Sequence, residues 1–346
     1  MPSDQAPTRP LHTRGGSGTR PMPVTPGNVV PPRAATPPPT GPSSPPPRGP
    51  SPAPGAGDVG AVRVAPRVVA ALVAAGAAVL AWMVWRYFVD TYAGQMAERA
   101  AFDGAVTGQG PLWAVAEPVL DTVSVTLVVV GLGAAMGIAL LRRRWGLAVQ
   151  VAFLVVGANV TTQLVKHDVL GRENLIGGWT ADNSLPSGHT TVAASVAAAL
   201  LLVVPRQTRP LVAVLGAAYT AATGVSTLVG QWHRPSDVVA AVLVVLAWGA
   251  LVCAFTPRSA LDRDAGGSPG SVVTSVLLLL TSVVGTAAAL WAYRSTPATW
   301  GTTTAQEATA YVGGVAGVGA ATAAVFAVLL LVRQAAARPD LRRVRG

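Results

Sequence analysis

Long apolar blocks that contain no charged residue constrain this chain more than any other feature. Among these blocks, 68–85, 122–141 and 238–257 contain no Asp, Glu, Lys or Arg over their whole length. Each is close to the roughly 20 residues with which an α-helix crosses the hydrocarbon core of a bilayer. Only 12% of the 346 residues are charged, about half the share of soluble domains. The pattern predicts an all-α, polytopic membrane bundle.

The apolar blocks predict eight transmembrane helices. They are placed at about 66–89, 118–141, 146–165, 188–204, 211–229, 236–256, 271–293 and 309–333. The fourth is the shortest and begins with polar residues, as expected of a site at the membrane surface. Six helices form a core, and two further helices follow at the C-terminus.

The ends of the chain differ from the apolar blocks in composition. Residues 1–60 hold 18 of the 29 prolines, so we expect residues 1–62 to be a disordered, Pro-rich tail without the apolar region of a signal peptide. We place a membrane core at 63–256, two additional transmembrane helices at 257–333 and a basic tail at 334–346.

The net charge of +10 follows the membrane pattern. With the N-terminus in the cytoplasm and eight crossings, 19 of the 25 basic residues lie on the cytoplasmic side, as the positive-inside rule requires. We therefore expect a multi-pass cell-membrane protein with both termini cytoplasmic. Arginines that flank apolar spans, in so apolar a chain, argue against a nucleic-acid partner.

The segment 183–190, Asn-Ser-Leu-Pro-Ser-Gly-His-Thr, opens the fourth predicted span. Ser187 is a candidate N-cap. The backbone N–H groups of Gly188 and His189 then point outward at a helix N-terminus, which favours anions. The alternative is an ordinary helix cap with an interfacial histidine.

Two basic residues end the third span. Lys166 is the only lysine in a chain with 24 arginines, and Arg172 follows it closely. An ammonium and a guanidinium hold phosphate oxygens in complementary ways. The alternative for Lys166 is a side chain that reaches the interface.

His233 and Asp237 lie one helical turn apart at the start of the sixth span. A carboxylate that accepts from one ring nitrogen raises the basicity of the other, which prepares a histidine as nucleophile or base. Alternatively, Asp237 only complements the helix dipole.

Together these segments resemble the type 2 phosphatidic acid phosphatase superfamily, which includes lipid phosphate phosphatases and vanadium haloperoxidases. Pro186-Ser-Gly-His189 matches the second motif, and Ser226, His233 and Asp237 match the spacing of the third. The chain departs from the pattern where Thr227 replaces an arginine, and where Arg172 comes one residue early and is followed by Glu173 rather than proline.

The resemblance implies a histidine nucleophile, His233, oriented by Asp237, with His189 as acid and base. Lys166, Arg172, Ser187 and the Gly188 amide are implied to hold the phosphate. No metal and no cofactor is expected. The implied substrate is a lipid phosphate (phosphatidate, phosphatidylglycerophosphate or a polyprenyl diphosphate) cleaved on the extracytoplasmic face through a phosphohistidine.

Two alternatives come from other classes. A metal-dependent hydrolase would gather His167 and Asp168 with the residues above, and a non-catalytic phospholipid-binding protein would explain Thr227. A haloperoxidase does not fit eight spans. The Ala, Val, Gly and Arg bias resembles that of bacteria with GC-rich genomes. The sequence makes no prediction of oligomeric state.

Overall fold

The computed structural model describes residues 61–109, 114, 125–141, 143–178, 183–262 and 268–340. All of them belong to one compact unit, Ala56–Gly346. Residues 1–60 of the predicted disordered tail, the first part of the second predicted span and the last residues of the basic tail lie outside the described residues. Residues 61 and 62, predicted as the end of the disordered tail, form a short strand instead, because they pair with residues 339 and 340.

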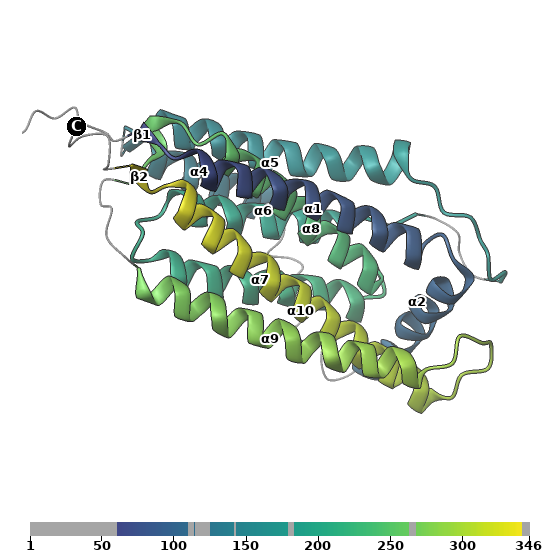
Figure 1. Ribbon diagram of the computed structural model, residues 1–346. Coiled ribbons are helices and arrows are strands. Elements are labelled where there is room, and N and C mark those ends of the chain that lie inside the picture. The colour runs from purple at the N-terminus through teal and green to yellow at the C-terminus, as the bar shows by residue number, and fades with distance from the viewer. Residues whose placement is uncertain are drawn as a thin grey trace, which may run out of the picture. The chain divides into compact units, whose positions relative to one another are not determined.

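Eight long helices match the eight predicted spans (Figure 1). They are α1 (Val64–Phe88), α4 (Val125–Leu141), α5 (Trp145–Leu164), α6 (Gly188–Val203), α7 (Arg209–Val229), α8 (Pro235–Ala254), α9 (Pro269–Ser295) and α10 (Thr304–Ala336). Among the described residues, six helices are long and apolar enough to cross a membrane, and α4 and α6 are shorter apolar helices. The expected all-α membrane bundle is confirmed.

Five shorter elements accompany these helices in the described residues. Helix α2 (Tyr92–Gly104) follows α1 and was not predicted from the sequence. A π-helical turn, η1 (Val165–Val169), continues α5, and a 3-10 turn, η2 (Arg258–Ala260), follows α8. The two-residue strands β1 (Ala61–Val62) and β2 (Pro339–Asp340) pair antiparallel and join the two ends of the described chain.

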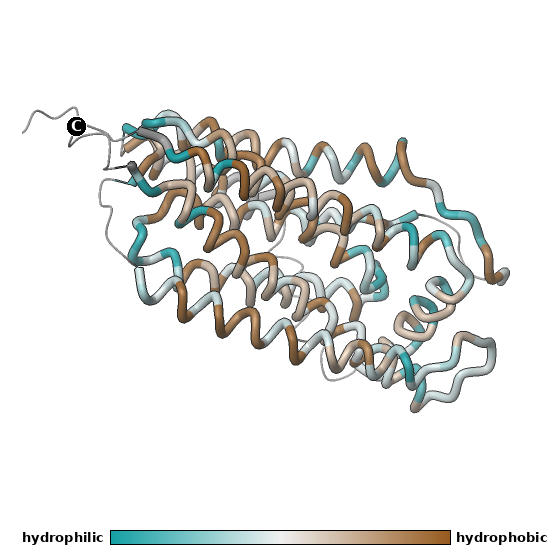
Figure 2. The backbone as a smooth tube through the Cα atoms, viewed as in Figure 1, coloured by the Kyte–Doolittle hydropathy of each residue, from teal (hydrophilic) through white to brown (hydrophobic). Residues whose placement is uncertain are grey.

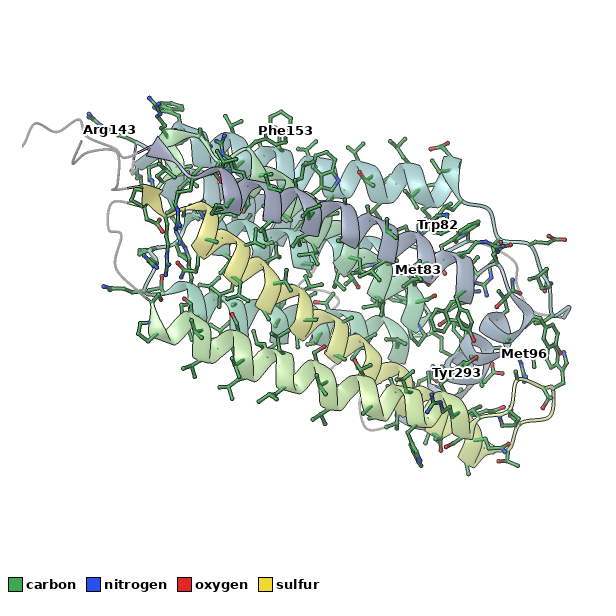
Figure 3. All side chains as sticks on the ribbon, in the orientation of Figure 1. Trp82, Met83, Met96, Arg143, Phe153 and Tyr293 are labelled. Carbon is green, nitrogen blue, oxygen red and sulfur yellow. The ribbon has the colours of Figure 1, made fainter. Side chains whose placement is uncertain are left out.

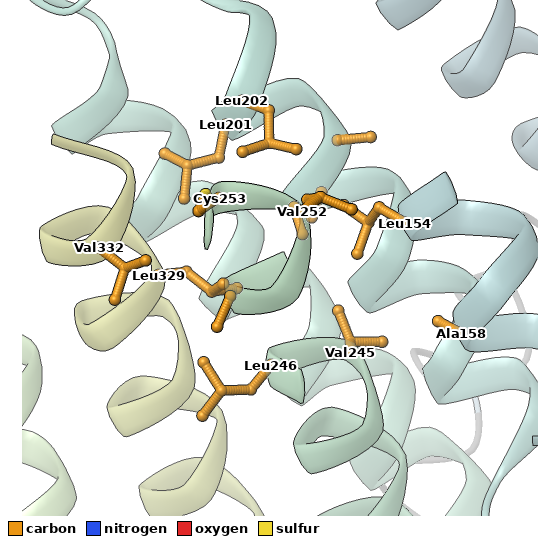
Figure 4. Close-up of a cluster of buried hydrophobic side chains, with 14 of the residues drawn as sticks. Leu154, Ala158, Leu201, Leu202, Val245, Leu246, Val252, Cys253, Leu329 and Val332 are labelled. Atoms are coloured by element: carbon orange, nitrogen blue, oxygen red, sulfur yellow. The ribbon is translucent and has the colours of Figure 1, made fainter. Parts of the chain in front are cut away.

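Helix α8 lies at the centre of the core. It is apolar on all sides, and a helix of this kind is buried. Val245, Leu246, Val252 and Cys253 of α8 belong to one buried cluster with side chains of α5, α6 and α10 (Figure 4). Because α8 also begins with Pro235 and Asp237, the best-packed helix of the bundle carries one part of the predicted site.

Apolar residues follow the length of the helices, and polar residues gather near the helix ends (Figure 2). Helix α9 leaves large side chains exposed, among them Leu277 at 58%, Leu280 at 56% and Val284 at 69%. Burying such side chains against lipid tails removes them from water. Helix α9 is therefore a lipid-facing helix of a membrane protein.

The bundle has two different ends. The site end carries η1, α2 and the start of α8, and Met96 and Tyr293 mark it in Figure 3. The arginine end carries β1, β2 and Arg143 on the opposite side. Buried arginines gather at the arginine end: Arg209 Nη1 and Nη2 bind the Asp262 carboxylate at 2.8 and 2.7 Å, and Arg333 Nε donates to Leu202 O at 3.1 Å.

Candidate functional site

The turn between α7 and α8 holds the predicted histidine–aspartate pair. His233 Nδ1 lies 3.2 Å from Asp237 Oδ2, and both side chains are buried. The turn is fixed by its backbone, because the N–H groups of Trp232 and His233 both donate to Thr227 O, at 3.0 and 3.3 Å. With Nδ1 directed at the carboxylate, Nε2 of His233 is the nitrogen that is left for chemistry.

Asp237 Oδ2 is a shared acceptor for several donors. Ser184 Oγ donates to it at 2.6 Å, and the Arg234 backbone N–H donates at 2.9 Å, which caps α8. Arg234 Nη1 in turn donates to Ser184 Oγ at 2.8 Å. Hydrogen bonds of this kind favour the ionised carboxylate. Ionised Asp237 can then accept a hydrogen bond from the Nδ1–H group of His233.

The start of α6 lies against the start of α8. The Ser187 backbone N–H donates to Asp237 O at 2.9 Å. Ser187 Oγ accepts from the backbone N–H of Thr190 at 3.4 Å, so the predicted N-cap is confirmed. A Cβ atom built on Gly188 would meet only the side-chain amide of Gln163 at 3.8 Å, which leaves open space beside the first turn of α6.

The two motif histidines lie close together, His189 in the first turn of α6 and His233 in the turn between α7 and α8. The ring centroids of His189 and His233 lie 6.4 Å apart, and the His189 ring lies 5.5 Å from that of Trp232. His189 is half-buried, at the first turn of α6. Two imidazoles at this separation can flank one phosphoryl group, one as nucleophile and the other as proton donor.

Cationic side chains surround this pair. Lys166 of η1 interacts electrostatically with His189. Arg172 lies near Arg234, and burial together with the Arg234 guanidinium lowers the pKa of Arg172 to about 10, so Arg172 remains protonated at neutral pH. The structure therefore brings Lys166 to His189, and Arg172 to Arg234 and Asp237.

One asparagine joins the loop before α6 to η1. Asn183 Nδ2 donates to Lys166 O at 3.2 Å and to Leu170 O at 2.8 Å. These bonds hold the backbone that carries Lys166 beside the segment that leads to His189. This role of Asn183 was not predicted, because a single asparagine before a motif indicates no particular partner.

Helix α2 supports the site from behind. Gln95 binds the loop after Arg172, donating to Glu173 O at 2.6 Å and accepting from Leu175 N at 3.2 Å. Glu98 accepts from Ser236 N at 3.3 Å and from Ser236 Oγ at 2.8 Å, next to Asp237. Burial, with the nearby Asp237 carboxylate, raises the pKa of Glu98 to about 7.

The same helix anchors the strained residue of the histidine turn. Gln231 has a positive φ of 54°, which is uncommon for a residue with a side chain. Its Nε2 donates to Phe102 O of α2 at 2.8 Å, and its Oε1 accepts from Gln109 at 3.0 Å. Gln95, Glu98 and Gln231 were not predicted as part of the site. The amphipathic pattern of residues 92–104 is the sequence signal that could have indicated α2.

Thr227 is not part of the anion site. It is fully buried, and its Oγ1 donates to Gly224 O at 2.7 Å within α7. Arg234, seven residues later, supplies a guanidinium next to Arg172 and Asp237 instead. The loss of one motif arginine is therefore accompanied by another arginine at the same site.

The predicted metal alternative depends on His167 and Asp168. Both side chains are exposed on η1. In the part of the chain that the structure describes, no group of three or more His, Cys, Asp or Glu residues is placed to hold a metal ion.

A known protein family matches the segment that carries the site. The family model of the PAP2 superfamily matches residues 156–260. The match covers about a third of the chain. It runs from α5 to η2 and includes Lys166, Arg172, His189, His233 and Asp237, so the resemblance drawn from the motifs is confirmed. No curated protein and no solved structure matches the chain.

Proposed function

We propose that this membrane protein is a phosphatase that hydrolyses the phosphate of a lipid, with His233 as nucleophile. The observation that supports this most directly is the contact of His233 Nδ1 with Asp237 Oδ2, with the His189 ring across from it at a centroid distance of 6.4 Å. The PAP2 match over this segment gives the reaction class.

The proposed reaction has two steps. In the first, Nε2 of His233 attacks phosphorus, the bond from phosphorus to the lipid oxygen breaks, and protonated His189 gives its proton to that oxygen. In the second, neutral His189 takes a proton from water, the water oxygen attacks phosphorus, and the bond from phosphorus to Nε2 breaks. Inorganic phosphate and the dephosphorylated lipid leave, and both histidines return to their starting states.

The phosphoryl oxygens need fixed positive charge throughout, which is the main source of catalysis in phosphoryl transfer. We assign this role to Lys166, Arg172, the Gly188 amide and, in addition, Arg234. Ser187 is assigned to the same anion site, through its cap of the α6 N-terminus. In this scheme no step requires a metal or cofactor.

The substrate class follows from the position of the site at the ends of lipid-facing helices. A headgroup reaches such a site while its apolar chains stay in the bilayer. Phosphatidate, phosphatidylglycerophosphate and polyprenyl diphosphates are the candidates.

The test is phosphate release from these lipids by the purified protein in detergent with EDTA present. We expect release by the wild type and loss in His233→Ala. His167→Ala is the matched control, because His167 is an exposed histidine of the same site end. Full activity in His233→Ala, or loss of activity with EDTA in the wild type, contradicts the mechanism.

We further propose that both termini are cytoplasmic and that the site end is extracytoplasmic. The excess of arginine at the end with β1 and β2 supports this orientation. Cys253 is buried and is the only cysteine, so Cys253→Ala gives a background for single cysteines. In intact cells, Gly301→Cys at the site end should react with a membrane-impermeant maleimide, and Ser259→Cys should react only after lysis. The reverse pattern refutes the orientation.

A phospholipid-binding protein without turnover is the second candidate, and Thr227 is the observation that favours it. This candidate predicts that lipid phosphates bind to the wild type while none is hydrolysed. The position of Arg234 beside Arg172 supports the enzyme over this alternative.

A further inference from the structure

A cavity of about 630 Å³ lies behind the phosphate site, between α1, α2, α8, α9 and α10. Its volume falls within the roughly 300–1,000 Å³ of ligand pockets. Pro235 and Ser236, which line it, are the two residues directly before Asp237. The cavity and the phosphate site therefore lie on either side of the first turn of α8.

The cavity is elongated along α10, as a site for an extended hydrocarbon chain would be. On α10 its lining extends from Ala310 to Ala324, which is about 21 Å at the helical rise of 1.5 Å per residue. That length exceeds half of the roughly 30 Å hydrocarbon core. A lining of this length matches an extended apolar chain that lies along α10.

Polar groups gather at one end of the cavity. Glu98 and Ser236 line it at the site end, and the hydroxyl groups of Tyr87 and Tyr293 hydrogen-bond to each other there, between α1 and α9. Along the rest of the cavity, the polar lining residues are Ser282 and Thr286. An occupant therefore has a polar head at Glu98 and an apolar tail that extends into the bundle.

The head of this occupant carries no phosphate. Among the described residues that line the cavity, none is Lys, Arg or His, and Glu98 contributes a carboxyl group. An anionic head would meet this carboxyl with no cation in the cavity lining, since Arg172 and Arg234 act on Glu98 from outside the lining, and such a charge is costly at a buried site. A hydroxyl group both donates and accepts, so it can pair with Glu98 whether the carboxyl is ionised or neutral.

We propose that this cavity binds an uncharged long-chain alcohol, with its hydroxyl group at Glu98 and Ser236 and its chain along α9 and α10. This assigns a binding role to the two helices that follow the phosphatase segment. The proposal that the cavity binds an alcohol is based only on the geometry and lining of the cavity. Its identification as a site for the lipid alcohol that the phosphatase releases rests on the proposed function.

The glycines of α10 offer a matched pair of variants. A Cβ atom at Gly317, in the cavity wall, would meet only Ala289 Cβ at an ordinary 3.5 Å, so Gly317→Leu puts a side chain into the cavity without a backbone clash. A Cβ atom at Gly319 has nothing within 4 Å, and Gly319 does not line the cavity. Gly319→Leu is therefore the control, and Ala324→Leu is a second filling variant.

The experiment uses the full-length protein in phosphatidylcholine nanodiscs and a hexadecanol that carries a photoreactive diazirine. Labelled peptides should map to α9 and α10, and labelling should fall about tenfold or more in Gly317→Leu and Ala324→Leu but not in Gly319→Leu. Melting temperatures show that each variant is folded. Equal labelling of the folded filling variants and the control overturns the proposal.

Two further measurements test the uncharged head and the link to the phosphatase separately. Unlabelled hexadecanol should compete with the probe and hexadecyl phosphate should not; equal competition overturns the uncharged head. Labelling is also measured in His233→Ala, which needs no turnover. Labelling at the cavity of a wild type that releases no phosphate would refute the proposed function alone, and phosphate release by the wild type without labelling would refute the cavity proposal alone.

Discussion

The buried carboxyl of Glu98 makes a quantitative prediction about pH and stability. Folding raises its pKa from 4.5 to about 7, so the folded protein keeps a proton that the unfolded chain loses between these two values. In that window the unfolded state binds fewer protons, and the free energy of unfolding therefore falls as pH rises. Below pH 4.5 both states are protonated, and above about pH 7 the loss is complete.

The size of the effect follows from the shift. A difference of about 2.5 pKa units at 1.36 kcal/mol each gives roughly 3 kcal/mol of stability lost across the window. Glu98→Gln cannot ionise, and its amide oxygen can still accept from Ser236. The variant should therefore gain stability relative to the wild type by roughly 3 kcal/mol between pH 4.5 and pH 7.5.

The assay is thermal unfolding in detergent, followed by tryptophan fluorescence at several pH values. At roughly 2–4 °C per kcal/mol, the difference in Tm between variant and wild type should change by about 6–12 °C across the window. Comparing the two proteins at each pH cancels the carboxylates that they share. Glu173→Gln, at an exposed glutamate, should follow the wild type. Parallel Tm curves for Glu98→Gln and the wild type would refute a buried carboxyl with a raised pKa.

Two substitutions test other contacts. Arg234→Ala should lower kcat/KM for a lipid phosphate roughly 10- to 150-fold, because a hydrogen bond to a charged group contributes about 1.5–3 kcal/mol; unchanged kcat/KM would remove Arg234 from the anion site. Asp262→Asn should destabilise the bundle by about 3–5 kcal/mol, since it leaves the buried Arg209 guanidinium without its carboxylate. A Tm within 1–2 °C of the wild type would show that the pair contributes little.

Several features were readable from the sequence because they depend on local pattern. The length of each charge-free block sets the length of a membrane helix, and all eight predicted spans match helices. Ser187 caps α6 as predicted, since a cap involves only the next turn. His233 and Asp237 meet because the tight turn after α7 leads directly into the first turn of α8, which keeps two residues four apart in the sequence within hydrogen-bond distance.

Other features depend on contacts between distant segments. The sequence shows Thr227 as a missing arginine, but only the structure places Arg234 beside Arg172, from a different loop. Glu98 lies 138 residues from the serine that it binds. No periodicity indicates such a pair, because the helix that carries Glu98 is short, polar and outside the apolar blocks.

The sequence by itself determined the membrane class, the helices, their order and the motif residues, since hydropathy and spacing act within a single segment. The tertiary structure alone decided that α2 supports both loops of the site, that Arg234 joins its cations and that α9 and α10 enclose a cavity behind it. The physical reason is that buried polar side chains and cavities are defined by the packing of several helices at once. The sequence of a helix indicates which of its residues are apolar, but not which other helix packs against them. That pairing is decided only when the bundle assembles.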